Sequence, residues 1–435
     1  MTQFTNQESF RQQTEELNKM VSNLDSSDLP TANIIVAGIT GTGKSTLLNA
    51  VFGSDMAKTG IGRPVTTNIA VYSDPQIPVV IWDTVGLELD SSKTEKSIQD
   101  IRKKIAEKAS SKDPFDRIHA IWYCVSAPAK RYQGAELDFV RNLHSIGVPF
   151  IIVMTQCYSG IDDDDFEKVI REINQSSGIG DIEVIQVLAN DKSTPLGAIP
   201  AFGLDKLVKT TTEKLPEFIK DGFVAAQRID VVQKRIRCEA IIIEYVSAAK
   251  NGFWDKVPFI NIITTDSKIN KMFEKIGKMY ITYLKAESIE DATKKCAVDF
   301  KNNFHGLINP WNSGYVENVL RFLTEMKDKD GFEVEVLRFI SPEWVPTDGF
   351  ASSGGRGLGE VLVSAAVKGL MDTLNIDDDS ALMIAFYGYT FVMAIEELWD
   401  KFTEEQLKDV NLVITNLVGL INKKLNKVRS GQSGK

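Results

Sequence analysis

The sequence predicts an α/β fold, a mostly parallel sheet with helices on both faces, followed by an all-α domain. Short apolar runs alternate with helical segments through the first half of the chain, a pattern typical of parallel sheets covered on both sides. Two of these runs, 34–37 and 150–154, are apolar without interruption, as central strands buried on both faces are. Beyond Pro216 the short strands give way to long helical patterns.

The same patterns set the expected element and domain boundaries. We expect strands at 33–38, 68–72, 79–82, 118–126, 150–154 and 184–188, with helices at 45–52, 93–110, 134–145, 166–175 and 204–215. Farther along, helices are expected at 223–250, 266–325, 359–374, 379–400 and 403–427, with a flexible loop at 340–359. The predicted domains are an N-terminal amphipathic helix and turn (1–30), an α/β domain (31–216) and a helical C-terminal domain (217–435).

Composition is that of an ordinary globular protein, with 43% hydrophobic and 25% charged residues among 435. The net charge of −9 argues against broad binding to nucleic acid or anionic lipid. The four cysteines match neither a metal site nor a disulfide framework. Cys124 and Cys157 lie in apolar runs typical of buried strands, so we expect core thiols there, in a reducing cytosol. The first 30 residues lack the apolar core of a signal peptide, and no apolar run reaches the ~18–20 residues that span a bilayer.

A glycine-rich segment between the first strand and the first helix carries the strongest chemical signal. Residues 38–45 read GITGTGKS and match G-x-x-x-x-G-K-[ST], whose glycines let backbone N–H groups turn inward around phosphates. We expect Lys44 to reach the β- and γ-phosphates and the Ser45 hydroxyl to ligate Mg²⁺. The predicted nucleotide contacts here are Gly38, Thr40, Gly41, Thr42, Gly43, Lys44, Ser45 and Thr46.

Two further segments are placed to complete a metal and phosphate site. Asp83 ends the apolar strand at 79–82, where the Mg²⁺ shell needs a carboxylate, and the Gly86 N–H can then sense the γ-phosphate. Between the two motifs, 60–68 is expected to be a mobile loop with a threonine that completes the Mg²⁺ shell. Thr66 is preferred as that ligand, with Thr67 beside it.

These motifs, GITGTGKS, Pro-Val-Thr at 64–66 and DTVG at 83–86, stand in the order and spacing of a known family. Over residues 33–215 the sequence resembles the Era/TrmE-like branch of the Ras-like P-loop GTPases. The resemblance implies a Ras-like sheet, GTP and GDP as ligands, Mg²⁺ as cofactor and hydrolysis of the β–γ phosphoanhydride. It implies catalytic roles for Lys44, Thr66 and Gly86.

The segment that reads the base departs from this family. The family has Asn/Thr-Lys-x-Asp after the fifth strand, and this chain has Thr155-Gln156-Cys157-Tyr158. Thr155 fits, and the stem of Gln156 can stack along the base. Tyr158 cannot replace the bidentate carboxylate, which leaves the choice between guanine and adenine open. A later segment resembles the last family motif, with the Ala189 N–H facing guanine O6 and Asn190 next to it.

The residue after Gly86 bears on the rate of hydrolysis. Ras-type proteins carry a water-orienting glutamine there, whereas this chain has Leu87, as Era-like relatives have an apolar residue. Slow turnover is therefore expected unless Glu88 or a partner positions the water. A solvated switch residue is the alternative interpretation of Glu88.

The leading hypothesis is a GTP-binding switch that signals through its helical domain, to a protein effector or by self-association. One alternative is an ATP or promiscuous NTP hydrolase on the same fold, and another is a dynamin- or immunity-GTPase-like assembler on membranes. Charged residues at 368, 372 and 377–379 interrupt the apolar segments of the helical half, so buried helices are favoured over membrane association. We expect a cytoplasmic protein that binds no nucleic acid, with a peripheral membrane location as the less favoured alternative.

Overall fold

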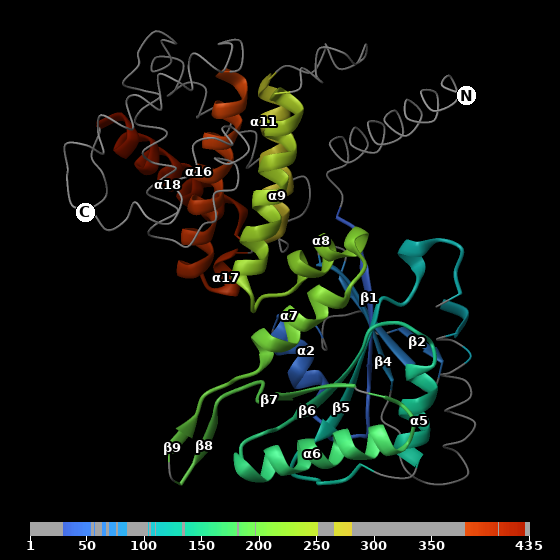
Figure 1. Ribbon diagram of the computed structural model, residues 1–435. Helices are drawn as coiled ribbons and strands as arrows, with labels where there is room; N and C mark the ends of the chain where they lie inside the picture. Colours follow the sequence, from blue (N-terminus) through green and yellow to red (C-terminus); the bar gives the residue numbers. More distant parts are fainter. Residues whose placement is uncertain are drawn as a thin grey trace, which may run out of the picture. The chain divides into compact units, whose positions relative to one another are not determined.

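The computed structural model describes most of residues 29–250, together with 265–280 and 379–430 (Figure 1). The longest gaps in the first range are 57–62 and 85–102. The chain forms two compact units: the sheet unit, Leu29–Lys234, and the helical unit, which takes in the described residues from Arg235 onward. The expected elements that lie wholly or mostly outside the described residues are the N-terminal helix within 1–30, the helical segments at 93–110, 266–325 and 359–374, and the loop at 340–359.

The sheet unit contains a seven-stranded, mostly parallel sheet in the order β2-β3-β4-β1-β5-β6-β7 (Figure 1). Strands β4, β1, β5, β6 and β7 are parallel neighbours, and β2 and β3 add an antiparallel edge. This confirms the expected fold class. The strands are β1 (Ala32–Ala37), β2 (Arg63–Thr66), β3 (Ile69–Asp74), β4 (Ile77–Thr84), β5 (Ala120–Ser126), β6 (Phe150–Thr155) and β7 (Glu183–Val187).

Helices cover both faces of the sheet, and the side chains of β5 show how they divide. Tyr123 faces the core formed with α5 (Ala135–His144) and α6 (Ile161–Ser176), where its ring lies 6.0 Å from Phe139. Trp122 points to the other face, stacks on Phe52 of α2 (Lys44–Phe52) at 5.9 Å, and donates to Thr211 Oγ1 of α7 (Leu204–Lys214) at 3.1 Å. Because successive strand residues point to opposite faces, an uninterrupted apolar strand suits this central position.

The prediction of a single helix at 223–250 is wrong, because the chain forms two helices, α8 (Glu217–Ala226) and α9 (Val231–Lys250), with a turn between them. Gln227 is fully buried in that turn, and its side-chain oxygen accepts from the N–H groups of Ile229 and Asp230, both at 2.7 Å. These bonds give the backbone an alternative to the helical ladder. The sheet unit also extends past the expected boundary at 216, because α8 packs against β1 and β4.

Gly222 marks how closely α8 approaches the start of β1. A Cβ built on Gly222 would lie 1.6 Å from the carbonyl oxygen of Pro30. We therefore expect Gly222→Ala to destabilise the sheet unit by about 1–3 kcal/mol, since backbone must move to relieve the overlap. The same substitution at Gly419, inside α18 (Val410–Ser430), meets nothing within 4 Å and is expected to stabilise by up to about 1 kcal/mol through helix propensity. Chemical denaturation of the two variants measures both changes, and equal effects would contradict this packing.

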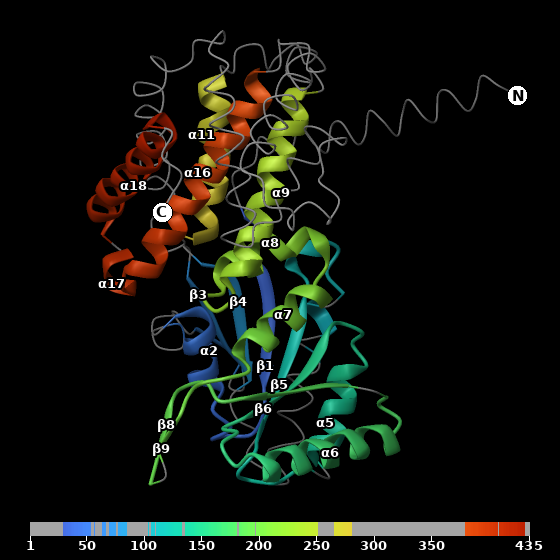
Figure 2. The same cartoon turned by 60° about the vertical axis from the view of Figure 1, so that its left-hand side comes forward.

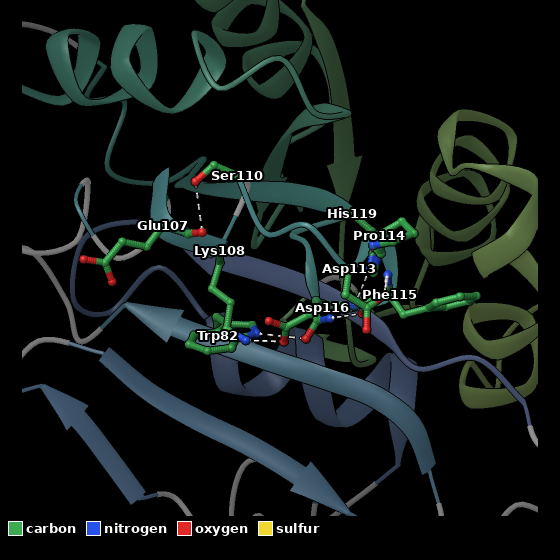
Figure 3. Close-up of polar contacts among 10 residues, drawn as sticks. Trp82, Glu107, Lys108, Ser110, Asp113, Pro114, Phe115, Asp116 and His119 are labelled. Carbon is green, nitrogen blue, oxygen red and sulfur yellow. Dashed lines mark hydrogen bonds and ion pairs between the residues drawn. The ribbon is translucent and has the colours of Figure 1, made fainter.

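A polar cluster closes the end of the sheet where β1 and β5 begin (Figure 3). The Nδ1 atom of buried His119 accepts from the Asn33 N–H at 2.9 Å, so the neutral ring donates from Nε2 to the Pro114 carbonyl at 3.0 Å. The Lys108 ammonium lies 5.4 Å from the centroid of the Trp82 ring and also bonds the carboxylate of Asp116. These contacts fix the short 3₁₀ turn Pro114–Asp116 against the strands.

His119 gives the protein a specific pH dependence. Burial lowers the pKa of His119, so the unfolded chain binds the proton more readily than the folded chain. Stability then falls as the pH drops from about 6.5, the ordinary histidine pKa, toward the lower folded value. We expect urea midpoints between pH 7.5 and 5.5 to fall more steeply for the wild type than for His119→Gln. Parallel slopes in the two proteins would contradict this assignment.

The helical unit consists, among the described residues, of α9 from Arg235 onward, α11 (Thr265–Tyr280), α16 (Asp379–Lys401), α17 (Glu404–Leu407) and α18. Helices α11 and α16 pack through Phe273 and Phe391, whose rings stack at 4.3 Å. A bidentate ion pair joins Arg235 of α9 to Glu396 of α16 (3.0 and 2.7 Å), and the Tyr280 hydroxyl donates to the same carboxylate. None of the helices in the described part of the chain is both long and apolar enough to cross a bilayer.

Candidate functional site

The glycine-rich segment forms a tight loop between the end of β1 and the start of α2. Gly41 and Gly43 have φ angles of +85° and +78°, values that side chains with a Cβ rarely adopt. Gly38 approaches β5 so closely that a Cβ there would lie 2.4 Å from the Cys124 carbonyl oxygen. The loop therefore requires these glycines, and it directs the N-terminus of α2 at whatever lies inside the loop.

Lys44 begins α2 and is buried within the loop. Its ammonium donates to the carbonyl oxygens of Gly38 (2.9 Å) and Ile39 (3.1 Å). These bonds hold the positive charge over the concave side of the loop, where it can meet a phosphate. Ser45 and Thr46 follow in the first turn, and both are exposed. Thr40 and Gly41, at the tip of the loop, are exposed as well.

Asp83 provides a carboxylate beside this loop. It lies near the end of β4, paired with Val36 of β1, and its Oδ1 atom is buried with no hydrogen-bond partner among the described residues. Burial raises the pKa of Asp83 to about 6, although the nearby Lys44 charge lowers it. A buried carboxylate without a partner suits a bound cation, so the residues present fit Mg²⁺.

The metal site would be sparse in protein ligands. The described residues hold no cluster of three or more His, Cys, Asp or Glu side chains that could bind a metal by themselves. Ser45 and Asp83 are candidates among them, with Thr66 of β2 as the expected further ligand. Mg²⁺ commonly takes one or two protein carboxylates and completes its shell with water and substrate phosphates. This donor set therefore suits Mg²⁺ delivered together with a phosphorylated ligand.

The expected switch residues are described only in part. Thr66 was expected in a mobile loop, but residues 63–66 form the edge strand β2, in which Thr66 pairs with Ile69 of β3. Antiparallel pairing to β3 explains the difference, since the loop signal in the sequence carries no information about the strand opposite. Thr67, Gly86 and Glu88 lie outside the described residues.

The end of β6 is tied to the phosphate loop by two side chains. The Thr155 hydroxyl donates to the Thr42 carbonyl at 2.6 Å, and the Gln156 Nε2 atom donates to the Gly41 carbonyl at 3.2 Å. Gln156 has a φ of +59°, and its Oε1 atom accepts from the Ser126 hydroxyl at 3.0 Å. Ser126 escaped the sequence analysis because only the register of β5 against β6 brings it to this point.

The last expected motif reaches the same edge of the sheet. The Cys157 N–H donates to the Val187 carbonyl at 3.2 Å, which holds the turn after β6 beside the end of β7. Ala189, half-buried, and Asn190, exposed, follow β7 directly. The structure thus joins Thr155 and Gln156 to the phosphate loop, although they are far apart from it in the sequence. The segment 189–190 follows the strand whose end bonds the turn at Cys157.

A small hairpin after this segment was not foreseen. Strands β8 (Lys192–Thr194) and β9 (Gly197–Ile199) pair antiparallel and project from the sheet unit (Figure 2). The Lys192 ammonium lies 5.6 Å from the centroid of the Tyr158 ring. The Pro195 and Gly197 turn signals between the two short strands are the sequence feature that could have indicated the hairpin.

Comparison with known families identifies the domain that contains this loop. Residues 33–156 match a family model described as "50S ribosome-binding GTPase". The chain contains a P-loop GTPase domain. Members of this family bind and hydrolyse GTP. No curated protein matches the chain.

Solved structures similar to the GTPase domain are distant. A bacterial selenocysteine-specific elongation factor, EF-Sec, shares 16% identity over 43% of this chain at a TM-score of 0.29, and the match spans 29% of that protein. A probable GTP-binding protein, engB, shares 18% over 44% of this chain and 99% of its own (TM-score 0.29). Aquifex aeolicus Era bound to GDP and aluminium fluoride shares 18% over 51% of this chain and 68% of its own (TM-score 0.30).

Proposed function

We propose that this protein is a GTP-binding switch that hydrolyses GTP slowly in the presence of Mg²⁺ and signals through its helical residues. The proposal rests on two charged side chains, one on the helix that follows β1 and one near the end of β4. Lys44 is held over the phosphate loop by two backbone carbonyls, and the buried Oδ1 atom of Asp83 has no hydrogen-bond partner among the described residues. A Mg²⁺-bound triphosphate would supply a cation for the Asp83 carboxylate and an anion for the Lys44 ammonium.

The roles of the residues follow from their positions. The backbone N–H groups at 38–46 and the Lys44 ammonium would hold the β- and γ-phosphates, while Ser45 and Asp83 would hold the metal, with Thr66 as the expected further ligand. Bound Mg²⁺ supplies charge neutralisation for the leaving phosphate. Leu87 cannot orient a water molecule, so intrinsic turnover is slow, and Glu88 or a partner is left to position the nucleophile.

Contacts at the far end of α2 support the signalling part of the proposal. The Arg228 N–H, in the turn between α8 and α9, donates to the Val51 carbonyl near the last turn of α2 at 2.8 Å. Phe52 packs edge-on against Phe223 of α8 at 6.1 Å. The helix that begins at the phosphates therefore ends on the segment from which α9 departs, and a shift of α2 on hydrolysis would reach that segment directly.

The recipient of the signal is proposed to be a protein effector or a second copy of this chain, in a cytoplasmic setting. Cys124 and Cys157, the expected core thiols, are buried and free, and so is Cys238. Free thiols are typical of proteins in a reducing compartment. Light scattering with GDP and with a non-hydrolysable GTP analogue tests self-association. Liposome flotation tests the less favoured peripheral membrane location.

Phosphate release from GTP tests the central proposal. We expect measurable, slow release with Mg²⁺ and none above background with EDTA. Mg²⁺ binds here only together with the triphosphate, and the triphosphate is held for hydrolysis only together with Mg²⁺. Equal rates under both conditions would reject the proposed mechanism. A contaminating hydrolase is excluded as the source of the phosphate when the activity elutes with the protein peak in gel filtration.

A further inference from the structure

The turn after β6 lacks the carboxylate with which related domains read guanine, and Tyr158 stands in its place. The Tyr158 side chain is 39% exposed, and the Lys192 ammonium lies 5.6 Å from its ring centroid. The Cys157 N–H bond to the Val187 carbonyl keeps this turn beside Ala189. An exposed aromatic ring and a cation therefore lie where the base of a bound nucleotide is expected, next to the Gln156 contact with the phosphate loop.

The acidic residues nearby each have a partner of their own. Asp163 is buried in the first turn of α6, where its Oδ2 atom accepts from the Ser159 N–H at 2.7 Å. The others form ion pairs or hydrogen bonds with their own neighbours. These further pairs are Asp162 with Lys130, Asp164 with Gln186, Asp165 with Lys168, and Asp191 with the Ala201 N–H.

Tyr158 and a carboxylate differ in how they can contact the edge of guanine that carries the N1–H and the 2-amino group. Guanine presents the N1–H and the 2-amino group as adjacent donors, and the two oxygens of a carboxylate accept from both with a full negative charge. A tyrosine hydroxyl has one neutral oxygen, while the ring offers a flat face for stacking. The Lys192 ammonium is a donor, which favours a purine with acceptors at O6 and N7.

We propose that the base subsite takes 6-oxopurine nucleoside triphosphates through the ring face and the O6 edge, without reading the 2-amino group. GTP and ITP, which differ only in that group, are then equivalent ligands. This inference rests on the proposed function, since it concerns the base of the nucleotide whose phosphates occupy the loop at 38–45.

Calorimetric titration of the full chain with GTP and with ITP, both with Mg²⁺, tests the inference. We expect the two dissociation constants of the wild type to differ by less than about tenfold. Tyr158→Asp should raise the preference for GTP over ITP by about tenfold or more, because the new carboxylate forms a charge-assisted bond with the 2-amino group. Tyr158→Asn is the matched neutral control and should stay within the tenfold limit.

The possible results distinguish a failure of this inference from a failure of the proposed function. A wild-type preference for GTP above tenfold overturns the inference, as does an unchanged ratio in Tyr158→Asp, since the side chain would then not face the base. Failure of both nucleotides to bind overturns the proposed function itself. Because Tyr158 is partly exposed and makes no buried hydrogen bond among the described residues, these variants should fold, and circular dichroism checks that they do.

Discussion

Lys44→Ala is expected to lower the affinity for Mg²⁺-GTP by tenfold or more. The substitution removes a charge-assisted phosphate contact worth about 1.5–3 kcal/mol. Because charge on the phosphates grows as the bond breaks, turnover should fall further, by roughly 10²–10³-fold. The structure strengthens this expectation, since two loop carbonyls already hold the Lys44 ammonium in place and little ordering is left for binding.

Calorimetry and phosphate release measure the two effects of Lys44→Ala. The matched control is Lys206→Ala, which removes an exposed lysine from α7, away from the loop, and should leave both unchanged. Wild-type GTP affinity in a folded Lys44→Ala protein would show that the loop at 38–45 does not bind phosphate.

Asp83→Asn is expected to have opposite effects in the free and the nucleotide-bound protein. Without nucleotide, the variant should be more stable at pH 7 by up to about 2–3 kcal/mol, because it removes a buried charge whose pKa burial raises to about 6. With Mg²⁺-GTP, the variant should lose most of the stabilisation that the wild type gains, and its turnover should fall, because the metal loses its carboxylate ligand.

The pH dependence of this effect has a definite sign. The folded state binds the Asp83 proton more tightly than the unfolded state, so the wild type loses stability as the pH rises from about 4 to about 6, and the full cost is present above that. The melting temperatures of wild type and Asp83→Asn should therefore coincide near pH 4, separate as the pH rises to about 6, and keep a constant difference above that. Asp205→Asn, an exposed change on α7, is the control for general charge effects. A variant that is less stable than the wild type at pH 7 without nucleotide would refute the buried-charge account.

Local pattern was enough to find the strands and the phosphate loop. Uninterrupted apolar runs such as 150–154 are buried for their whole length. Such strands can therefore be recognised from their own residues. The loop motif likewise needs only its glycines, whose positive φ values are a property of those positions alone. The hairpin β8–β9 and the strand β2 were missed because three- and four-residue strands are stabilised by the strand opposite rather than by their own sequence.

The break between α8 and α9 was also beyond the sequence. Apolar residues continue at helical spacing through 223–250, and no proline or glycine marks the turn at 227–230. The helix ends there because the side chain of buried Gln227 satisfies the backbone N–H groups of the turn, and because the Arg228 N–H bonds Val51 of another helix. The contact with Val51 exists only after α2 has packed against this turn.

The sequence by itself determined the α/β fold, the phosphate loop and the chemistry expected of Lys44, Ser45 and Asp83, because each depends on residues adjacent in the chain. Only the tertiary structure decided that Asp83 is buried beside Lys44, that Gln156 and Thr155 brace the loop, and that the carboxylates after β6 are already engaged. Those facts depend on the register of parallel strands joined by long crossovers, which sets contacts between residues distant in sequence.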